Sequence, residues 1–328
     1  MSSALLREGW AVCCARRPSR GDGVEYPGYR CLCGETRAIE VWRGPLRGSG
    51  ISREFAGLAC SRCALVSVHP PVRDEDMAAA LGSRGWRGLH CPQAPRSAGL
   101  KVRASAAELF RRLVMAELPP PASILDIGTG TGGMAGRLRD AGYQVTGIEP
   151  DAEMAAEAAA RGLQVHPTTF EDWSPPDTRY EGVLMSNVLE HLAEPLEVLR
   201  KIKSLLAPAG RLFIEVPNIQ RPKTSYRRTL QLVHRWYFCP GSLGYLLGLA
   251  GLAPVVERVF RLDCLQVVAG HAREGAALPA VAPGLARDIR GRLRRHRWLY
   301  YARLQFVWRK VPGLRQLIFF TAPEVRRY

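Results

Sequence analysis

The stretch that decides the fold reads ILDIGTGTGG and covers residues 124–133. Its apolar start predicts a short buried strand that carries one acidic residue, Asp126. Gly128, Gly130 and Gly132 follow at alternate positions, and glycine lets a backbone turn tightly and approach a ligand closely. Helical spacing begins directly after them. The stretch therefore predicts a strand, a ligand-binding turn and a helix whose first N–H groups can face a negative group.

Strands and helices alternate on the C-terminal side of this stretch. Apolar runs predict strands at residues 123–127, 144–149, 164–167, 180–186, 211–216, 254–260 and 264–269. Helical spacing and proline or glycine stops predict helices at residues 103–118, 132–141, 151–161, 195–206 and 241–250. Such alternation builds a sheet with helices on both faces. The sequence therefore predicts an α/β fold with a doubly wound, mostly parallel sheet.

Glu149 ends the strand after the glycine turn, 23 residues beyond Asp126. A carboxylate at this place can accept hydrogen bonds from ribose hydroxyls. Glycine-rich turns also bind nicotinamide dinucleotides, so an oxidoreductase stays open from the turn alone. The Asp-x-Gly-x-Gly-x-Gly spacing, Glu149 and the later segments together resemble the class I S-adenosylmethionine-dependent methyltransferases. The resemblance implies a Rossmann-like fold with seven strands, a methionine-binding turn at Asp126, Gly128 and Gly130, and a ribose contact at Glu149.

The same resemblance extends to two later loops. After the third strand, Phe170 and Glu171 match the places where the family packs an apolar side chain on the adenine ring and binds its amino group. Asp172 is an equal candidate for the polar role, and a plain solvated loop is the alternative. After the fourth strand, Asn187 and Val188 match residues that lie beside the cofactor in the family.

Two histidines are candidates for the catalytic base. Transfer of a methyl group to a hydroxyl needs a group that accepts a proton, and histidine suits that role near neutral pH. The resemblance implies that His191 faces the cofactor pocket and that His234 covers the substrate side. The alternatives are that His191 holds its loop and that His234 packs in the core. Glu215 and Asn218, at the end of the fifth strand, are candidates for the acceptor pocket.

Two cysteine pairs lie ahead of this domain, at Cys31 and Cys33 and at Cys60 and Cys63. Four cysteines in two such pairs indicate a tetrahedral structural zinc site. They resemble the small zinc-ribbon-like segment found ahead of many bacterial methyltransferases. Two departures stand out: the first pair has one residue fewer than usual between its cysteines, and Ala64 replaces the usual glycine. The alternative is a module of four reduced thiols without metal.

The positive charge is concentrated at the C-terminal end. The formal net charge is +16, and residues 287–328 contribute twelve Arg and Lys against two acidic residues, a surplus of ten. Basic residues interleaved with aromatics suit an anionic membrane surface or RNA. A helix packed on the domain with a solvated basic face is the third interpretation. The methyltransferase domain itself needs no polyanionic substrate to explain its charge.

The odd number of cysteines, nine, and the lack of an apolar signal-like stretch in residues 1–20 favour a reducing, cytoplasmic setting, with peripheral membrane contact left open. We predict methyl transfer from S-adenosylmethionine to an oxygen of a small-molecule or sugar-like acceptor. An RNA methyltransferase and a non-catalytic S-adenosylmethionine-binding protein are the alternatives. The predicted organisation is a poorly ordered extension at 1–27, the zinc-ribbon-like module at 28–72, a connector and leading helix at 73–120, the methyltransferase domain at 121–271 and the basic aromatic extension at 272–328.

Overall fold

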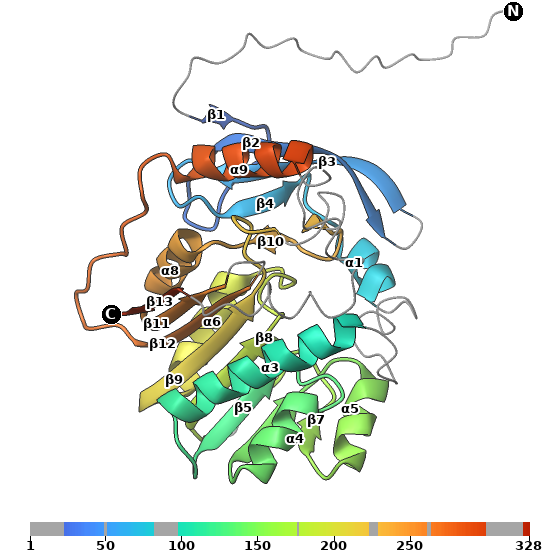
Figure 1. Cartoon of the computed structure of the whole chain (residues 1–328), viewed down its shortest axis with the longest axis vertical. Coiled ribbons are helices and arrows are strands. Elements are labelled where there is room, and N and C mark those ends of the chain that lie inside the picture. The colour runs from blue at the N-terminus through green and yellow to red at the C-terminus, as the bar shows by residue number, and fades with distance from the viewer. Residues whose placement is uncertain are drawn as a thin grey trace, which may run out of the picture.

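Two β-sheets organise the chain, and Figure 1 shows the smaller one above the larger one. The computed structural model describes residues 23–48, 51–81, 98–175, 177–222, 229–260, 264–299 and 324–328. The larger sheet has eight strands and the smaller has five. Cys13, Cys14, Cys91 and residues 300–323 of the basic extension lie outside the described residues.

The large sheet has the strand order β13-β11-β12-β9-β8-β5-β6-β7. Its strands are β5 (Ser123–Ile127), β6 (Gln144–Ile148), β7 (Gln164–His166), β8 (Tyr180–Ser186), β9 (Leu206–Val216), β11 (Leu252–Val259), β12 (Leu265–His271) and β13 (Glu324–Arg327). The pairs from β7 through β9 are parallel, and the pairs beyond β9 are antiparallel. The chain runs from β5 toward β7 on one side and from β8 toward β9 on the other. The order therefore reverses beside β5, which is where open α/β sheets bind ligands.

Helices cover both faces of this sheet because its central strands are apolar on both sides. Ile124 of β5 packs with residues of α3 (Ala98–Glu117) and α4 (Gly133–Asp140). Leu125 and Ile127 face the other way, toward α6 (Pro195–Leu205) and α8 (Pro240–Leu249). The remaining helix, α5 (Ala152–Ala160), contacts β7 and begins at Asp151, whose side chain accepts two backbone hydrogen bonds.

The small sheet is antiparallel and draws its strands from two distant parts of the chain. Its order is β1-β2-β3-β4-β10, with β1 (Val24–Glu25), β2 (Arg37–Gly48), β3 (Ile51–Cys60), β4 (Val66–His69) and β10 (Trp236–Tyr237). Alternate residues of β3 face opposite sides, as a strand requires. Ala56 and Leu58 join the core that the large sheet shares with α6 and α8. Phe55 and Ala59 face a second core on the outer side.

The outer side of the small sheet is covered by α9 (Leu285–Leu299), which lies across β2 in Figure 1. Ala286, Ile289 and Leu293 form its buried stripe at helical spacing. Most of its arginines are exposed. In the part of the basic extension that the structure describes, the interpretation of a packed helix with a solvated basic face therefore matches what is seen.

The predicted α/β class and doubly wound sheet are confirmed, and the sheet gains one strand. The seven expected strands correspond to β5–β9, β11 and β12, whereas β13, at residues 324–327, adds an eighth at the edge. Regular elements also occur where the sequence suggested none: β1 at Val24–Glu25 and α1 (Asp74–Leu81). Among the described residues, no helix combines the length and the apolar character that crossing a membrane requires.

Candidate active site and cysteine centre

The glycine turn lies at the carboxyl end of β5 and is tied to β6. The N–H groups of Gly128 and Thr129 both donate to the carbonyl of Ile148, at 2.8 and 3.1 Å. Gly128 and Gly130 have φ angles of +73° and +57°, in the left-handed region that glycine adopts without strain. A Cβ at Gly128 would lie 2.5 Å from Cγ2 of Val188. The glycine turn and the Val188 loop therefore touch, which only a residue without a side chain permits.

Asp126 lies under this turn and is 4% exposed. Its Oδ2 accepts a hydrogen bond of 2.8 Å from the hydroxyl of Thr129. Burial raises the pKa of Asp126 to about 7, because desolvation disfavours the charged form. The side chain therefore braces the turn from within the sheet.

Glu149 follows β6 and reaches over to the glycine turn. Its Oε2 accepts from the N–H of Gly130 and its Oε1 from the N–H of Asp151, each at 2.9 Å. Burial raises the pKa of this carboxyl, and the two N–H donors act in the opposite direction. Asp126, Gly128, Gly130 and Glu149 thus meet at one edge of the sheet, although two separate strands supply them.

Phe170 lies in the core rather than on the surface of its loop. Its ring is 6.1 Å from that of Trp173, and Nζ of Lys201 lies 4.7 Å from its centroid. Lys201 also donates to the carbonyls of Phe170, Glu171 and Trp173. The Glu171 side chain is exposed. Lys201, which no sequence pattern singled out, therefore fixes this loop. The contacts of Phe170 and Glu171 with adenine stay predictions.

Asn187 and Val188 begin the loop after β8, and Glu215 of β9 holds that loop in place. The N–H of Asn187 donates to the Glu215 carbonyl at 2.8 Å. The Glu215 side chain accepts from Ser186 at 3.1 Å and from Gln266 of β12 at 2.6 Å. Glu215 thus links three strand ends behind the loop. Asn218, the second acceptor-pocket candidate, is fully buried and its Oδ1 accepts from the N–H of Gln220.

His191 and His234 lie against one another, with ring centroids 4.9 Å apart and an interplanar angle of 66°. The Nδ1 atom of His191 is 2.7 Å from the carbonyl of Val233. Burial lowers the pKa of His191 to about 4, so this imidazole is neutral near pH 7. The backbone N–H of His191 donates to the backbone carbonyl of Val188 at 2.9 Å. One short turn therefore connects Val188, which contacts the glycine turn, to the histidine pair.

Glu190, which was not among the residues predicted from the sequence, belongs to the same cluster. It is 1% exposed, and its Oε1 lies 3.9 Å from Nε2 of His191. One side-chain atom from each of Glu190, His191 and His234 lies within 4.8 Å of the others. The backbone carbonyl of Glu190 accepts hydrogen bonds from the N–H groups of Arg235 and Trp236, at the start of β10. The sequence signal that could have identified Glu190 is an acidic residue between two apolar residues, Val188 and Leu189, and His191. The three groups form a buried acid–base cluster where the two sheets meet.

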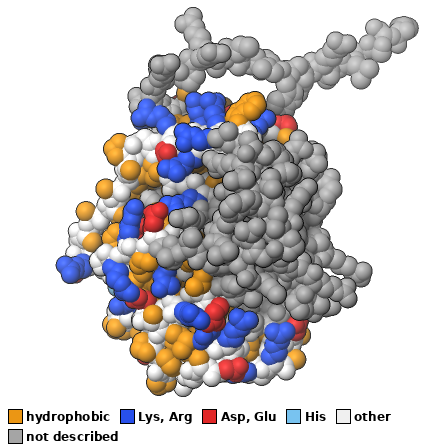
Figure 2. Space-filling model, in the orientation of Figure 1, with side chains coloured by type: hydrophobic (Ala, Val, Ile, Leu, Met, Phe, Trp, Pro, Cys, Tyr) orange, Lys and Arg blue, Asp and Glu red, His pale blue; other side chains and the backbone are white. Residues whose placement is uncertain are grey.

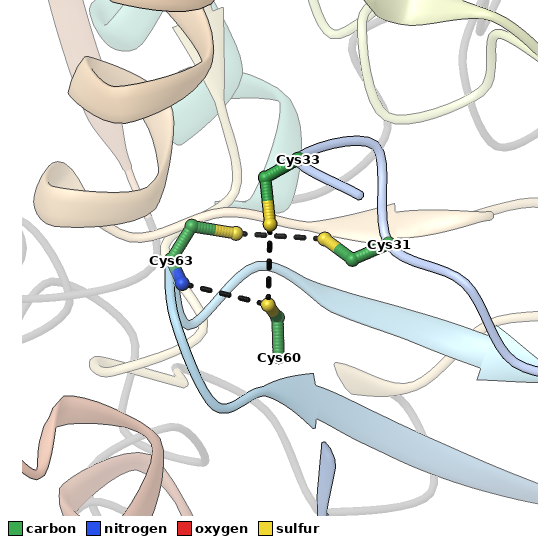
Figure 3. Close-up of side chains that lie close together, drawn as sticks. All are labelled: Cys31, Cys33, Cys60 and Cys63. Atoms are coloured by element: carbon green, nitrogen blue, oxygen red, sulfur yellow. Dashed lines mark hydrogen bonds between the residues drawn. The ribbon is translucent and has the colours of Figure 1, made fainter. Parts of the chain in front are cut away.

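The four predicted cysteine ligands converge on one point, as Figure 3 shows. The Sγ atoms of Cys31 and Cys63 are 3.5 Å apart, and so are those of Cys33 and Cys60. Tetrahedral zinc with Zn–S bonds of about 2.3 Å places its sulfurs about 3.8 Å apart, so the spacing fits this ion. Hydrogen bonds among the four sulfurs raise the pKa of Cys31 and Cys63 and lower that of Cys33 and Cys60. A divalent cation would compensate the charge of several thiolates held this close.

The two turns of the cysteine centre differ in how well they accommodate the departures from the usual cysteine pattern. In the first turn the N–H of Gly34 donates to the Cys31 carbonyl at 2.8 Å, and Gly34 has a φ of +86°. In the second turn Ala64 has a φ of +58°, which is the left-handed region. An alanine there costs about 1–2 kcal/mol relative to a right-handed conformation. The shortened first pair still reaches the cluster, whereas Ala64 leaves the second turn strained.

Comparison with known proteins bears on this site. Residues 100–257 match the family model described as a methyltransferase domain. The chain is 30% identical over 155 residues to a ubiquinone biosynthesis O-methyltransferase of Ruegeria pomeroyi, which is 42% of this chain and 62% of that protein. It is 31% identical over 169 residues to its counterpart in Cereibacter sphaeroides, 46% of this chain and 68% of that protein. The C-methyltransferase NovU of Streptomyces niveus is 30% identical over 174 residues, 50% of this chain and 41% of that protein.

A solved structure agrees on the fold. The 1,6-didemethyltoxoflavin N1-methyltransferase of Burkholderia thailandensis superposes with a TM-score of 0.50 at 23% identity, over 67% of this chain and 96% of that one. The chain belongs to the S-adenosylmethionine-dependent methyltransferases. None of these similar proteins is described as acting on RNA or at a membrane. The alternative of a nicotinamide oxidoreductase finds no support among them.

Proposed function

We propose that the protein transfers the methyl group of S-adenosylmethionine to a small-molecule or sugar-like acceptor, at an oxygen atom. The observation that carries the proposal is the contact between Gly128 and Val188, followed at once by His191. It puts a turn suited to the cofactor next to a neutral, buried base. The O-methyltransferase relatives favour oxygen, and the resemblance to NovU makes carbon the competing atom.

The cofactor side of this proposal consists of the turn and the two carboxylates beside it. Gly128 and Gly130 leave room for the methionine portion, and the edge position of Glu149 suits the ribose hydroxyls. Asn187 and Val188 would border the reacting end. When bound, S-adenosylmethionine supplies a methyl group on a positively charged sulfur.

The acceptor side consists of the histidine pair and Glu190. The Val233 carbonyl next to Nδ1 of His191 favours the neutral tautomer that carries its proton on Nδ1, and Nε2 is then the atom that we propose as the proton acceptor. Nε2 would then take the hydroxyl proton of the acceptor as the new O–C bond forms and the bond between the methyl group and the sulfur breaks. Glu190, 3.9 Å away, stabilises the resulting imidazolium, and His234 packs against the ring. The four cysteines of the cysteine centre form no disulfide, which suits a reducing compartment, and we place the protein in the cytoplasm.

The first test is calorimetric titration of S-adenosylmethionine, with NAD as the comparison ligand. Wild type should bind S-adenosylmethionine saturably and ignore NAD. Gly128→Ala should weaken binding at least about tenfold, because its Cβ meets Val188 and its φ is positive. Gly136→Ala is the matched control. Gly136 lies in α4, the added Cβ would have no neighbour within 4 Å, and the variant should bind as wild type does. Glu149→Ala should also weaken binding. Well-folded wild-type protein that does not bind S-adenosylmethionine would refute the proposal.

A further inference from the structure

Residues 233–237 pass between the two sheets, where Figure 1 shows β10 below β4. The first two residues of this segment contact His191. The Val233 carbonyl lies 2.7 Å from Nδ1 of His191, and the ring of His234 packs on its ring. The last two residues form β10 and pair with β4 of the small sheet. Five consecutive residues therefore join the candidate base to the small sheet.

Trp236 makes the contacts that fix this segment to the loop of His191. Its backbone N–H donates to the Glu190 carbonyl at 3.2 Å, and its indole Nε1–H donates to the Leu192 carbonyl at 2.8 Å. These two carbonyls belong to the residues on either side of His191. The indole ring is partly buried and packs against the core that the large sheet shares with α6 and α8. One residue thus holds the backbone on both sides of the candidate base.

Trp236 is also connected to the cysteine centre, through two strands. It lies opposite Ser67 of β4, and β4 pairs in turn with β3, which ends at Cys60. The N–H of Cys60 donates to the carbonyl of Leu65, the residue just before β4, at 2.9 Å. The turn that follows Cys60 therefore sets the position of β4, and β4 sets the position of Trp236.

Arg235 adds a second connection between the same parts of the molecule. Its guanidinium donates to the Val72 carbonyl at 3.0 Å and forms an ion pair with Asp74, at the start of α1. Its carbonyl accepts from the N–H of Val68 in β4 at 3.2 Å, and its own N–H donates to the Glu190 carbonyl at 2.9 Å. The small sheet thus holds two consecutive residues of the segment, so a displacement of β4 reaches the histidine pair.

We propose that Trp236 is a positioning residue that couples the cysteine centre to the histidine pair, so that an intact centre keeps the proton of His191 on Nδ1. This inference rests on the proposed role of His191 as the base. The Val233 carbonyl selects that tautomer only while it stays within hydrogen-bond distance of Nδ1. A small shift of residues 233–237 therefore releases the imidazole, and the cysteine centre controls the base without touching it.

The test is nitrogen NMR of the histidine side chains in the full-length, zinc-loaded protein near pH 7, with the His191 signals assigned from His191→Gln. The chemical shifts of the two ring nitrogens report which one carries the proton. Wild-type His191 should show the single tautomer protonated on Nδ1. Trp236→Phe keeps an aromatic ring but leaves the Leu192 carbonyl without its donor, so His191 should show signals averaged over both tautomers. Exchange protection of the His191 backbone N–H should fall at least about tenfold.

Trp298→Phe is the matched control, because it removes the same indole N–H from a residue that is 80% exposed. Trp298 belongs to α9, which covers the small sheet at the top of the molecule, where Figure 2 shows Lys and Arg side chains at the surface. The His191 signals of this variant should equal those of wild type. Removing zinc from wild type with a chelator tests the remote step, and it should give the averaged signals of Trp236→Phe.

Three results would overturn the proposal: a wild-type His191 that is not protonated on Nδ1, an unchanged tautomer in folded Trp236→Phe, and an unchanged tautomer after the chelator. Hydrogen exchange in β5 shows whether each sample keeps its large sheet, and if one sample does not, the other decides. Titration of S-adenosylmethionine on the same samples separates this inference from the proposed function. Wild type that binds the cofactor while His191 ignores both changes refutes only the coupling, whereas folded wild type that does not bind it refutes the proposed function.

Discussion

The two sheets of this molecule are held together in different ways. The large sheet is assembled mainly from neighbouring segments, and helices α4, α5 and α6 follow its strands β5, β6 and β8 and return the chain to the next strand. The small sheet needs β10 from residues 236–237, α9 from residues 285–299, and a cluster of four cysteines at the end of its hairpin. Both sheets are covered on two faces, but only the large sheet is covered mainly by helices that are close to its strands in sequence. Because the strands of the large sheet are mostly covered by helices close in sequence, that sheet can be predicted from the sequence. The small sheet is completed by segments distant in sequence, so we expect its stability to depend on the cysteine centre.

The largest effect should come from removing one cysteine ligand. Cys60→Ser should abolish stoichiometric zinc binding, and since zinc-binding free energy is folding free energy, of order 10 kcal/mol in small zinc peptides, the small sheet should open. Hydrogen–deuterium exchange should then show loss of protection in β2 and β3 and retention in β5 and β8.

Cys264→Ser is the matched control for that experiment. Cys264 lies outside the cysteine cluster, and a serine can keep its contact with Glu215. Zinc content and exchange should match wild type. Equal loss of protection in β5 and β3 of Cys60→Ser would show that the two sheets unfold as a single unit, which would break the contrast between them.

A smaller effect should appear on acidification, with opposite signs in two places. His191, where the sheets meet, has a folded pKa of about 4 against an ordinary 6.5, so the unfolded chain binds the proton first and stability is lost as pH falls from about 6.5 to 4. Asp126 in the large sheet has a pKa raised from 3.8 to about 7, so its contribution is lost as pH rises through that range. Each shift is worth on the order of 3–4 kcal/mol.

Urea unfolding between pH 4 and pH 7 checks both signs. The two ranges overlap, so the two contributions oppose one another in the wild type. His191→Gln should leave a stability that falls as pH rises from 4 to 7, and Asp126→Asn should leave a stability that falls as pH drops over the same range. Identical pH profiles for wild type and His191→Gln would show that the imidazole is not desolvated where the sheets meet.

The smallest effect should be a gain in stability at Ala64. Ala64→Gly relieves the strain of the left-handed conformation. Glycine also gives the unfolded chain more backbone entropy, which offsets part of this gain, so we expect a net stabilisation of about 0.5–1 kcal/mol. Gly34→Ala, the counterpart in the other cysteine turn, should destabilise by about 1–2 kcal/mol, although no neighbour lies within 4 Å of its Cβ. Thermal unfolding at constant zinc measures both. A destabilised Ala64→Gly would show that the methyl group contributes more through packing than it costs through strain.

The same contrast explains how far the sequence could predict the structure. The order of β5 to β9 follows from apolar runs and helical spacing, because each element pairs with a neighbour. The docking of β10 and α9 on the small sheet has no local signal, since Trp236 and Ile289 read only as apolar residues in short segments. At the site, Glu149 was predictable from its distance to Asp126. Glu190 and Lys201 were not, because the Glu190 carbonyl binds Arg235 and Trp236, which are distant in sequence, and Lys201 binds carbonyls of the 170–173 loop.

The path of the chain through β10 also limits how this molecule can be rebuilt by gene recombination. A gene fragment for residues 23–81 would carry four strands and all four cysteines into a new host protein. It would leave behind the strand that completes the sheet and the helix that covers its outer face. The recipient would acquire an open edge beside β4 and an apolar face without cover. Functional chimeras should therefore exchange the two sheets together.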